Sequence, residues 1–247
     1  MKTVVVTRPE NQAQPWIDAL RSRGMTVMHV PLMHISATNQ PELIQQAWKE
    51  IRQWTWVMFV SPNAVHYFFQ HACATPWPQQ LRAGSPGEGT TQALINAGVP
   101  AELIDQPEKH QEKDTDFLWQ NIKHRNWQSA RILLVRGTSA KPPRDWLMNR
   151  LQEVGAFVQP LVVYQRKSGI FSDKAQCWIH STQARQACWI ISSAESLNAL
   201  TRHDWSQATA IVIHPRIAQA VRQLEFGQII CVQPDLNSLI YSVESVV

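Results

Sequence analysis

Two stretches of the chain share one pattern: VVVTRPENQAQPWIDALRSRGMTVMHVPLMHI, residues 4–35, and ILLVRGTSAKPPRDWLMNRLQEVGAFVQPLVVYQR, residues 132–166. Each contains a short β-branched strand, a Thr-Arg or Arg-Gly turn, an amphipathic helix that ends near Gly24 or Gly155, and a second strand. Each then leaves through a Val-Pro-Leu or Gln-Pro-Leu exit. This internal repeat constrains the architecture of the whole chain.

A second pair of related segments follows, one after each of these stretches. The first member runs from WVMFVSPNAVHYFF through GEGTTQALINAGV to IDQPEKHQEKDTDFLW, residues 56–119. The second runs from WIISSAESLNAL through HPRIAQAVRQLEFG to VQPDLNSLIYSV, residues 189–243. Strand and helix alternate throughout, with helices expected at Gln12–Arg23 and Glu195–Thr201 among others. The pattern predicts an α/β protein with parallel sheets, built as two copies of a five-strand unit.

The domain boundaries follow from the two exits. The extended segments Pro31–Ile35 and Leu161–Gln165 look like matched crossing strands, which favours a crossed arrangement over the simpler pairing of consecutive segments. We therefore predict a discontinuous first domain, residues 1–35 with 168–247, an inserted second domain, residues 36–160, and linker strands at about 31–36 and 161–167. A cleft between two α/β domains is a common place for a ligand.

The composition excludes several classes of protein. The 247 residues are 44% hydrophobic and 17% charged, which is typical of packed globular domains and not of a disordered chain. The longest apolar runs fall far short of the ~20 residues of a membrane-spanning helix. No secretory signal follows Met1, so we expect a cytoplasmic protein with no membrane partner.

The spacing of the cysteines and histidines and the net charge limit which kinds of site the chain can form. The four cysteines form no C-x-x-C pair, and the nine histidines show no spacing such as H-E-x-x-H, so we expect neither a disulfide framework nor a metal site. The net charge of +4 suits an anionic partner, but lysine and arginine form no basic block. The net charge by itself is compatible with either a small acidic molecule or a nucleic acid as the partner.

An ordered set of short motifs runs through nearly the whole chain: Thr7-Arg8-Pro9, Phe59-Val60-Ser61-Pro62-Asn63-Ala64-Val65, Gly87-Glu88-Gly89-Thr90, Val135-Arg136-Gly137 and Val163-Tyr164-Gln165-Arg166. In this order the motifs resemble the uroporphyrinogen-III synthase family.

The resemblance implies a fold and an activity. The fold would be two Rossmann-like or flavodoxin-like parallel-sheet domains joined by a two-stranded β linker, with the ligand cleft between them. The enzyme would be a lyase of heme biosynthesis that converts hydroxymethylbilane, a linear tetrapyrrole, to uroporphyrinogen III by losing water, inverting ring D and closing the macrocycle. No metal and no organic cofactor is implied. We also expect a monomer that receives its substrate from hydroxymethylbilane synthase.

Arginines at strand ends are the first candidate site residues. Arg8, with Thr7 beside it, and Arg136 and Arg144 lie at or just after the carboxyl ends of strands, where α/β proteins place their ligand sites. The guanidinium group matches a carboxylate, of which the implied substrate carries eight. The alternative is ordinary surface salt bridging.

Hydroxyl, amide and glycine residues after the strands form a second set. Ser61, Asn63, Ser192 and Ser193 could cap the helices that follow while presenting N–H groups to an acetate or propionate, or could serve as caps alone.

Two turns complete this set. Gly87, Thr90 and Thr91 form a turn that lets the backbone approach an anion. In the second copy the family's G-x-T-T turn is replaced by His214–Ile217, where Arg216 could substitute by charge.

Tyr164 is the candidate catalytic residue that the resemblance implies. A phenol can donate a proton or a hydrogen bond to the departing hydroxyl group. An aromatic side chain packed at a domain junction is the alternative. Folding of the substrate, which holds its reactive end beside the correct pyrrole carbon, contributes to the reaction as well.

Two other functions stay open. A non-catalytic two-lobed module that binds an anionic metabolite would share the architecture, and Tyr164 would then be dispensable. A nucleic-acid-binding protein would fit the pI, but the chain shows no helix-turn-helix signal and no basic stripe, so we expect no nucleic-acid partner.

Overall fold

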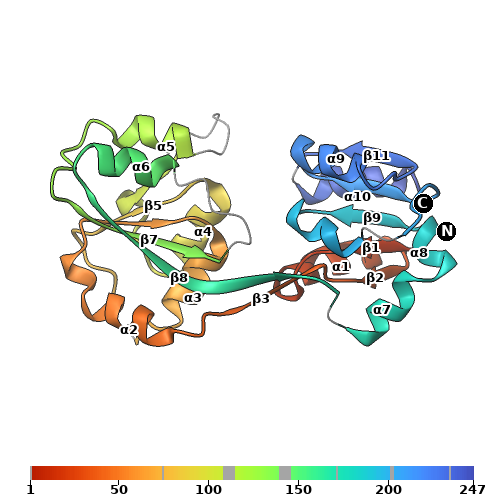
Figure 1. Cartoon of the computed structure of the whole chain (residues 1–247), viewed down its shortest axis with the longest axis horizontal. Helices are drawn as coiled ribbons and strands as arrows, with labels where there is room; N and C mark the ends of the chain where they lie inside the picture. Colours follow the sequence, from red (N-terminus) through yellow and green to blue (C-terminus); the bar gives the residue numbers. More distant parts are fainter. Residues whose placement is uncertain are drawn as a thin grey trace. The chain divides into compact units, whose positions relative to one another are not determined.

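The computed structural model describes residues 2–73, 75–107, 115–138, 146–170, 172–200, 203–233 and 235–247. The chain divides into two compact units, which Figure 1 shows. Unit 1 comprises Met1–Ile35 and Lys167–Val247, and unit 2 comprises Ser36–Arg166. Each unit has its own sheet and its own hydrophobic core.

The sheet of unit 1 joins the first and last parts of the chain. Its strand order is β11-β10-β9-β1-β2, and neighbouring strands run parallel. Its strands are β1 (Val4–Val6), β2 (Val27–His29), β9 (Cys188–Ile191), β10 (Thr209–Val212) and β11 (Gln228–Cys231). The central strands are apolar on both faces, as expected for a parallel sheet covered by helices on both sides.

Helices cover both faces of this sheet. The helices are α1 (Glu10–Ser22), α7 (Asp173–Ile179), α8 (Thr182–Gln186), α9 (Pro215–Arg222), α10 (Leu236–Glu244) and the 3-10 helix η3 (Glu195–Leu200). Val4 and Val6 point to the face covered by α1 and α10, whereas Val5 points to the face covered by α7, α8, η3 and α9. This alternation follows from the two-residue period of a strand.

The sheet of unit 2 has the order β3-β8-β7-β4-β5-β6. Its strands are β3 (Met33–Ala37), β4 (Trp56–Phe59), β5 (Arg82–Gly84), β6 (Ile104–Asp105), β7 (Arg131–Gly137) and β8 (Phe157–Ser168). All pairs from β8 to β6 are parallel. Backbone hydrogen bonds from Thr38 N to Val163 O and from Gly169 N to Leu32 O show that the segments of β3 and β8 pair antiparallel.

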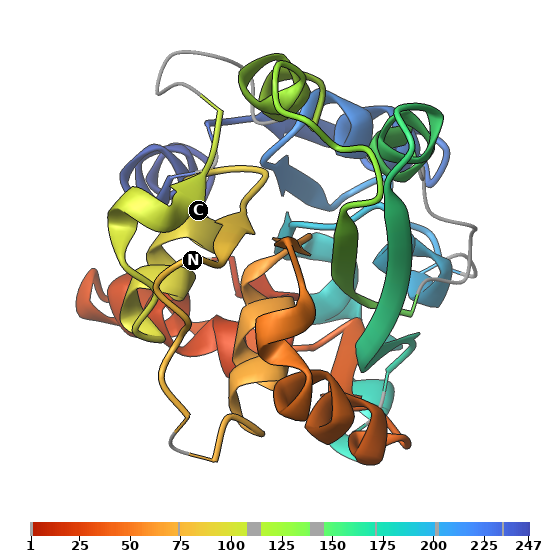
Figure 2. The same cartoon turned by 90° about the vertical axis from the view of Figure 1, so that its left-hand side faces the viewer.

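Helices again cover both faces, as Figure 2 shows. They are α2 (Pro41–Lys49), α3 (Pro62–Phe69), α4 (Glu88–Asn96), α5 (Thr115–Ile122), α6 (Trp146–Glu153) and the 3-10 helices η1 (Ile51–Gln53) and η2 (Ala101–Leu103). Trp56 and Met58 of β4 pack with α5 and α6. On the other face the ring of Phe59 lies edge-on to Phe68 of α3 at 5.4 Å.

The predicted α/β class with parallel sheets is confirmed. Two details of the prediction were wrong. The sheet of unit 2 has six strands among the described residues, not five, because β3 is added beside β8. Residues 195–200 form a 3-10 helix instead of the expected α-helix, a common form for so short a connection. No helix among the described residues is both long and apolar enough to cross a membrane.

Candidate functional site

Most of the predicted site residues gather at the carboxyl edges of the two sheets. In unit 2, Ser61 follows β4, the Gly87 turn follows β5, and Arg136 lies near the end of β7. In unit 1, Arg8 follows β1 and Ser192 follows β9. Because β7, β4 and β5 are neighbours in one sheet and β9 and β1 in the other, each set shares one edge.

A side-chain hydrogen bond in the unit 2 group joins Ser61 to Tyr164. Their hydroxyl oxygens lie 3.1 Å apart, although the residues are separated by 103 positions in the chain. Ser61 is half-buried at the N-terminus of α3, and Tyr164 of β8 is buried, with 2% of its surface exposed. The structure therefore joins two residues that the sequence offered separately.

The ring of Tyr164 is held on several sides. Tyr67 of α3 stacks on it with ring centroids 5.7 Å apart, and the Arg166 guanidinium lies 5.9 Å from its centroid. Burial, followed by the charge interaction with Tyr164, raises the pKa of Tyr67. A Cβ atom placed on Gly137 would lie 2.3 Å from the Tyr164 ring, so only glycine fits there. This packing leaves the phenol little freedom to move.

The Ser61 hydroxyl also caps α3. Its oxygen accepts a hydrogen bond from Ala64 N at 3.2 Å, which confirms the predicted cap. A serine oxygen has two lone pairs and one hydrogen. When the lone pairs accept from Ala64 N and from the Tyr164 hydroxyl, the Ser61 hydrogen remains available for a ligand. Asn63 lies within the first turn of α3, half-buried.

The turn after β5 is an internal hydrogen-bond network. Thr91 is buried, and its oxygen lies 2.9 Å from Ser85 Oγ and 2.7 Å from Gln106 Oε1. Ser85 Oγ also donates to Gly87 O at 2.8 Å. Thr90 is 4% exposed. These threonine side chains therefore shape the turn from inside, and the surface that it offers to an anion is the backbone near Gly87, the N-cap of α4.

Two of the predicted arginines belong to the segment from β7 onward. Arg136 is half-buried within β7, where it pairs with Val162 of β8. Its position near the carboxyl end of the strand is the one the sequence predicted. Arg144 lies outside the described residues.

In unit 1, Thr7 has a structural contact. Its side chain is 3% exposed, and its hydroxyl donates to Ile190 O at 2.7 Å. The bond ties the end of β1 to β9 across the sheet. The expected substrate contact through the Thr7 side chain therefore does not fit this burial.

Arg8 is the cation of unit 1 that best suits an anionic ligand. Its guanidinium lies 4.4 Å from the ring centroid of Trp16, and its Nη2 donates to Gln12 Oε1 at 3.2 Å. Its Nε is buried without a hydrogen-bond partner, and no described carboxylate forms an ion pair with it. Burial lowers the pKa of Arg8. A partly buried cation with no counter-charge gains most from a bound anion.

The remaining unit 1 residues differ from the expectation. Ser192 and Ser193 are half-buried but cap no α-helix, because η3 follows them; the Ser193 carbonyl accepts from Ser196 Oγ at 2.7 Å. Arg216 is exposed at the start of α9. His214 caps that helix, since its Nδ1 accepts from Arg216 N at 3.0 Å. The corresponding helix of the other copy, α4, has Gly87 as its N-cap residue and no side-chain cap.

Several residues around the site were missed by the sequence analysis. Tyr67 and Gly137 enclose Tyr164, and Ser85 and Gln106 organise the Gly87 turn. For Tyr67 alone the sequence held a signal, which is its helical spacing from the Ser61 cap. The others are brought together by packing of distant segments.

Comparison with known proteins agrees with this architecture. Residues 14–241 match the family model for uroporphyrinogen-III synthase HemD. A uroporphyrinogen-III synthase of Chlorobaculum parvum is 34% identical over 173 residues, 67% of this chain and 64% of that protein, so the match spans less than two thirds of the relative. A uroporphyrinogen-III synthase of Proteus mirabilis is 23% identical over 66% of this chain and 80% of its own.

Solved structures show the same fold. The uroporphyrinogen-III synthetase of Helicobacter pylori 26695 superposes with a TM-score of 0.65 at 15% identity, covering 100% of both chains. A mutant uroporphyrinogen III synthase of Thermus thermophilus gives 0.62 at 13% identity, covering 100% of this chain and 98% of the other. With the family model matched over most of its length, the chain belongs to the uroporphyrinogen-III synthase family.

Proposed function

We propose that this protein is a uroporphyrinogen-III synthase, which cyclises hydroxymethylbilane with loss of water and inversion of ring D. The match of residues 14–241 to the family model carries the proposal. The unit 1 and unit 2 groups of polar residues support it, because a substrate with many carboxylates needs cations and N–H donors at the edges of the sheets.

Arg8, Arg136 and Arg216 bind substrate carboxylates in this proposal. Arg8 contributes most per residue, because its guanidinium is half-buried and unpaired with any described carboxylate, whereas Arg216 is exposed. The N-termini of α3 and α4, near Ser61 and Gly87, add backbone N–H groups. The residues Asn63, Ser192, Ser193 and Arg144 complete the proposed binding set.

Ser61 donates a hydrogen bond to the hydroxyl group that leaves. The C–O bond of the hydroxymethyl group breaks, the electron pair stays on oxygen, and the pyrrole nitrogen supplies electrons to the carbon left behind. The pyrrole nitrogen loses its N–H proton, and the departing hydroxide takes up a proton, so that the group leaves as water. In this proposal Tyr164 is the donor in its 3.1 Å hydrogen bond with Ser61 Oγ, and it strengthens the donation by Ser61 because hydrogen bonds in series polarise one another. Tyr164, being buried, acts on the leaving group through Ser61 in this proposal.

The same proposal covers the setting of the reaction. The protein acts as a cytoplasmic monomer and receives hydroxymethylbilane from the synthase that makes it. Direct transfer suits a substrate that also closes without a catalyst. Sedimentation of the protein alone and mixed with that synthase tests the monomer and the handover.

A coupled assay tests the activity. Hydroxymethylbilane is generated by its synthase, this protein is added, and the oxidised products are separated as uroporphyrin I and III. Because the uncatalysed reaction closes without inversion, we expect isomer III to predominate. Isomer I alone, from protein with an intact circular dichroism spectrum, would reject the enzyme and favour a module that binds anionic metabolites.

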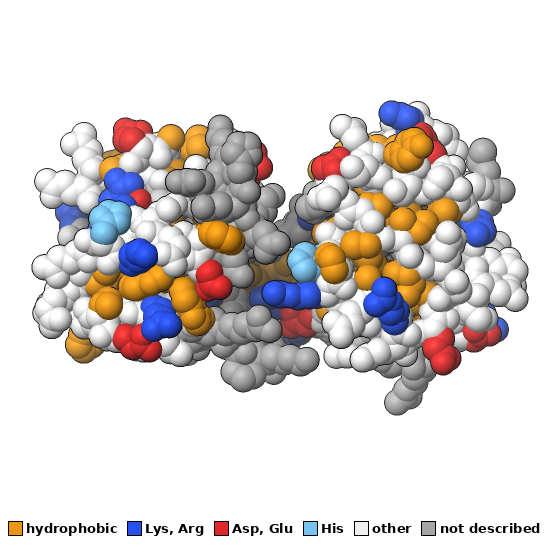
Figure 3. Space-filling model, turned by 90° about the horizontal axis from the view of Figure 1, so that it is seen from above, with side chains coloured by type: hydrophobic (Ala, Val, Ile, Leu, Met, Phe, Trp, Pro, Cys, Tyr) orange, Lys and Arg blue, Asp and Glu red, His pale blue; other side chains and the backbone are white. Residues whose placement is uncertain are grey.

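A nucleic-acid partner gains no support from the face of the molecule that Figure 3 draws. Figure 3 shows the lysine and arginine side chains of the described residues spread over the face and interspersed with acidic and polar groups. A nucleic-acid site would gather them along one stripe.

A further inference from the structure

The backbone that leads to Arg8 is held from both neighbouring strands of the unit 1 sheet. On one side, the Thr7 hydroxyl donates to Ile190 O of β9 at 2.7 Å. On the other side, the backbone N–H of Leu32, a few residues after β2, donates to Thr7 O at 3.2 Å. Because β1 lies between β9 and β2, these bonds fix the chain as far as Thr7.

The peptide that follows has one polar group through which it can be held. Pro9 lacks a backbone N–H, so the carbonyl of Arg8 is the only hydrogen-bonding group of the Arg8–Pro9 peptide. His29, the half-buried last residue of β2, places its Nε2 3.0 Å from this oxygen. A carbonyl oxygen only accepts, so Nε2 carries the proton in this contact. His29 therefore fixes the orientation of this peptide plane.

The orientation of this peptide sets the position of the Arg8 side chain relative to α1. Pro9 precedes α1 with a φ of −51°, which its ring restricts, so the Arg8–Pro9 peptide is a main source of freedom at the junction. Two residues of α1 contact the guanidinium: Gln12 Oε1 accepts from Nη2 at 3.2 Å, and the Trp16 ring centroid lies 4.4 Å away. Guanidinium N–H groups lie in one plane, so a face placed on Trp16 leaves the edge for a carboxylate.

We propose that His29 is a positioning residue for substrate binding. Its Nε2–H holds the Arg8 carbonyl, and the peptide held in this way keeps the guanidinium over Trp16 before the substrate arrives. A group that is ordered in advance binds more tightly, because less conformational entropy is lost on binding. The inference rests on the proposed function, in which Arg8 binds a substrate carboxylate, and it adds a residue outside the proposed binding set.

Steady-state kinetics of two His29 variants in the full chain test this role. Leucine fills the space without a donor, so His29→Leu should raise the KM for hydroxymethylbilane about 5-fold, as for the loss of one neutral hydrogen bond, and leave kcat nearly unchanged. Glutamine keeps an N–H donor, so His29→Gln should bring the KM back to within about 2-fold of the wild type. An unchanged KM in His29→Leu would overturn the proposal.

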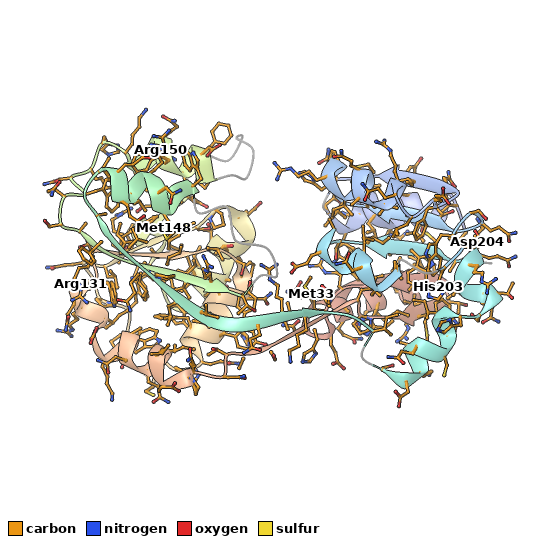
Figure 4. The ribbon with its side chains drawn as sticks, viewed as in Figure 1. Met33, Arg131, Met148, Arg150, His203 and Asp204 are labelled. Atoms are coloured by element: carbon orange, nitrogen blue, oxygen red, sulfur yellow. The ribbon has the colours of Figure 1, made fainter. Side chains whose placement is uncertain are left out.

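The Arg8→Gln background shows whether His29 acts through Arg8. Once the guanidinium is absent, His29→Leu should raise the KM no further. A residue needed only for the fold would add its full effect in both backgrounds, and that result would also overturn the proposal. The matched control is His203→Gln, which should keep the wild-type KM. His203, which Figure 4 labels in unit 1, lies with its ring centroid 5.3 Å from that of Trp205.

Nuclear magnetic resonance gives a readout that does not depend on turnover. Long-range proton–nitrogen correlations should show the His29 proton on Nε2 at about pH 8, where a free imidazole is neutral. The Arg8 Nε–H resonance should shift in His29→Leu and keep its position in His29→Gln. The variants at positions 8 and 29 assign both signals by their loss. A proton on Nδ1 of His29, or an Arg8 resonance that stays fixed in His29→Leu, would contradict the positioning role.

These outcomes separate the inference from the proposed function. Wild-type protein that yields only isomer I would reject the enzyme, and the positioning role of His29 in substrate binding with it. Wild-type protein that yields isomer III, together with an unchanged KM in His29→Leu, would reject the role of His29 alone.

Discussion

Individual side chains at the sheet edges differ in whether their polar atoms are already used within the protein. The Thr7 hydroxyl donates to Ile190 O, whereas the Arg8 Nε has no partner. Neighbours in the sequence therefore have different capacities to bind a ligand. Whether a donor already has a partner within the protein, more than residue type, separates structural from ligand-binding groups at this edge.

Replacement of Arg8 by glutamine tests its role as a carboxylate ligand. We expect the KM for hydroxymethylbilane to rise about 10-fold, because a charge-assisted hydrogen bond is lost. The free energy of unfolding should fall by only about 1 kcal/mol, since Arg8 forms no described ion pair and loses its contact with the Trp16 ring. The matched control is Arg23→Gln, which removes an exposed pair with Glu244. Steady-state kinetics in which both variants keep the wild-type KM would contradict the assignment.

Tyr164 can be compared with the other two tyrosines of the chain. Tyr164→Phe keeps the buried ring but removes the bond to Ser61 Oγ, so we expect kcat to fall about 10-fold with KM nearly unchanged. Ser61→Ala should cost more, about 10²-fold, because it removes the donor that contacts the substrate. The measurement is the initial rate of uroporphyrinogen III formation.

Tyr67→Phe and Tyr241→Phe serve as controls for that comparison. Tyr67 stacks on Tyr164, and Tyr241 is 77% exposed on α10. Tyr241→Phe should retain the wild-type kcat. If Tyr164→Phe also retains it, the role of the Ser61–Tyr164 pair is structural only.

At the scale of elements, β7 and β8 pack closely where Gly137 faces Tyr164. Gly137 pairs with Tyr164 in the ladder, just after a register shift between Arg136 and Gly137. A Cβ atom at this position would lie 2.3 Å from the ring. The position of the phenol therefore depends on the absence of a side chain on the neighbouring strand.

Gly137→Ala tests this close approach. We expect a loss of about 1–3 kcal/mol in the free energy of unfolding, because the ring or the strand must shift, and a lower kcat as the Tyr164 hydroxyl moves from Ser61. The control is Gly89→Ala in α4, where a Cβ would meet only Pro62 Cγ at 3.8 Å. That variant should keep or gain stability through helix propensity. Urea unfolding with equal midpoints for both variants would refute the steric argument.

The N-termini of the helices show which structural features the local sequence predicts. Ser61 caps α3 as predicted, because the Ser-Pro pair is a local signal. The residues after Ser192 and Ser193 form a 3-10 helix although the corresponding segment of the other copy forms α3. His214 as a cap was not predicted, since histidine is uncommon in that role and only the backbone geometry shows that it accepts from Arg216 N.

Over a whole unit, Asp105 joins elements that are distant in the chain. Its carboxylate accepts from Trp56 Nε1 at 2.9 Å, from Arg82 Nη2 at 2.6 Å and from Arg125 Nη1 at 2.6 Å. Burial alone would raise the pKa of Asp105, but the hydrogen bonds and charges of Arg125 and Arg82 outweigh it and hold the pKa below the ordinary value of 3.8. This cluster links β4, β5, β6 and the segment after α5.

The free energy of unfolding of unit 2 should therefore depend on pH in the acid range. A carboxyl group with a depressed pKa stabilises the fold above its ordinary pKa, and that contribution disappears as the pH falls through the folded-state value. We expect Asp105→Asn to reduce the free energy of unfolding by roughly 2–3 kcal/mol near pH 7, less than for a fully buried pair because both arginines are partly exposed. The loss should shrink as the pH falls below 3.8 toward the lower folded-state pKa, where Asp105 of the folded wild type becomes protonated. Denaturant unfolding from neutral to acid pH measures it.

The control for Asp105 is Glu153→Gln on α6. Glu153 pairs with Arg150 at 2.8 Å on the surface, where both side chains are about half exposed, so its removal should change stability little at any pH. A loss for Asp105→Asn that does not vary with pH would show that the Asp105 cluster acts by shape and not by charge.

The repeat, the parallel α/β class and the strand ends that carry Arg8, Ser61 and Gly87 could all be predicted from the order of residues. These features depend on hydrophobic periodicity and turn residues within short segments, and both can be recognised directly in the sequence. Contacts between distant segments could not be predicted in this way. The 3.1 Å approach of Ser61 to Tyr164, the burial of Thr7 and the contact of His29 with the Arg8 carbonyl each depend on how side chains pack once the strands are paired. Distances between side chains of distant segments are set only when the chain folds and packs. The tertiary structure alone therefore distinguishes residues whose polar atoms can bind a ligand from residues whose polar atoms already form hydrogen bonds within the protein.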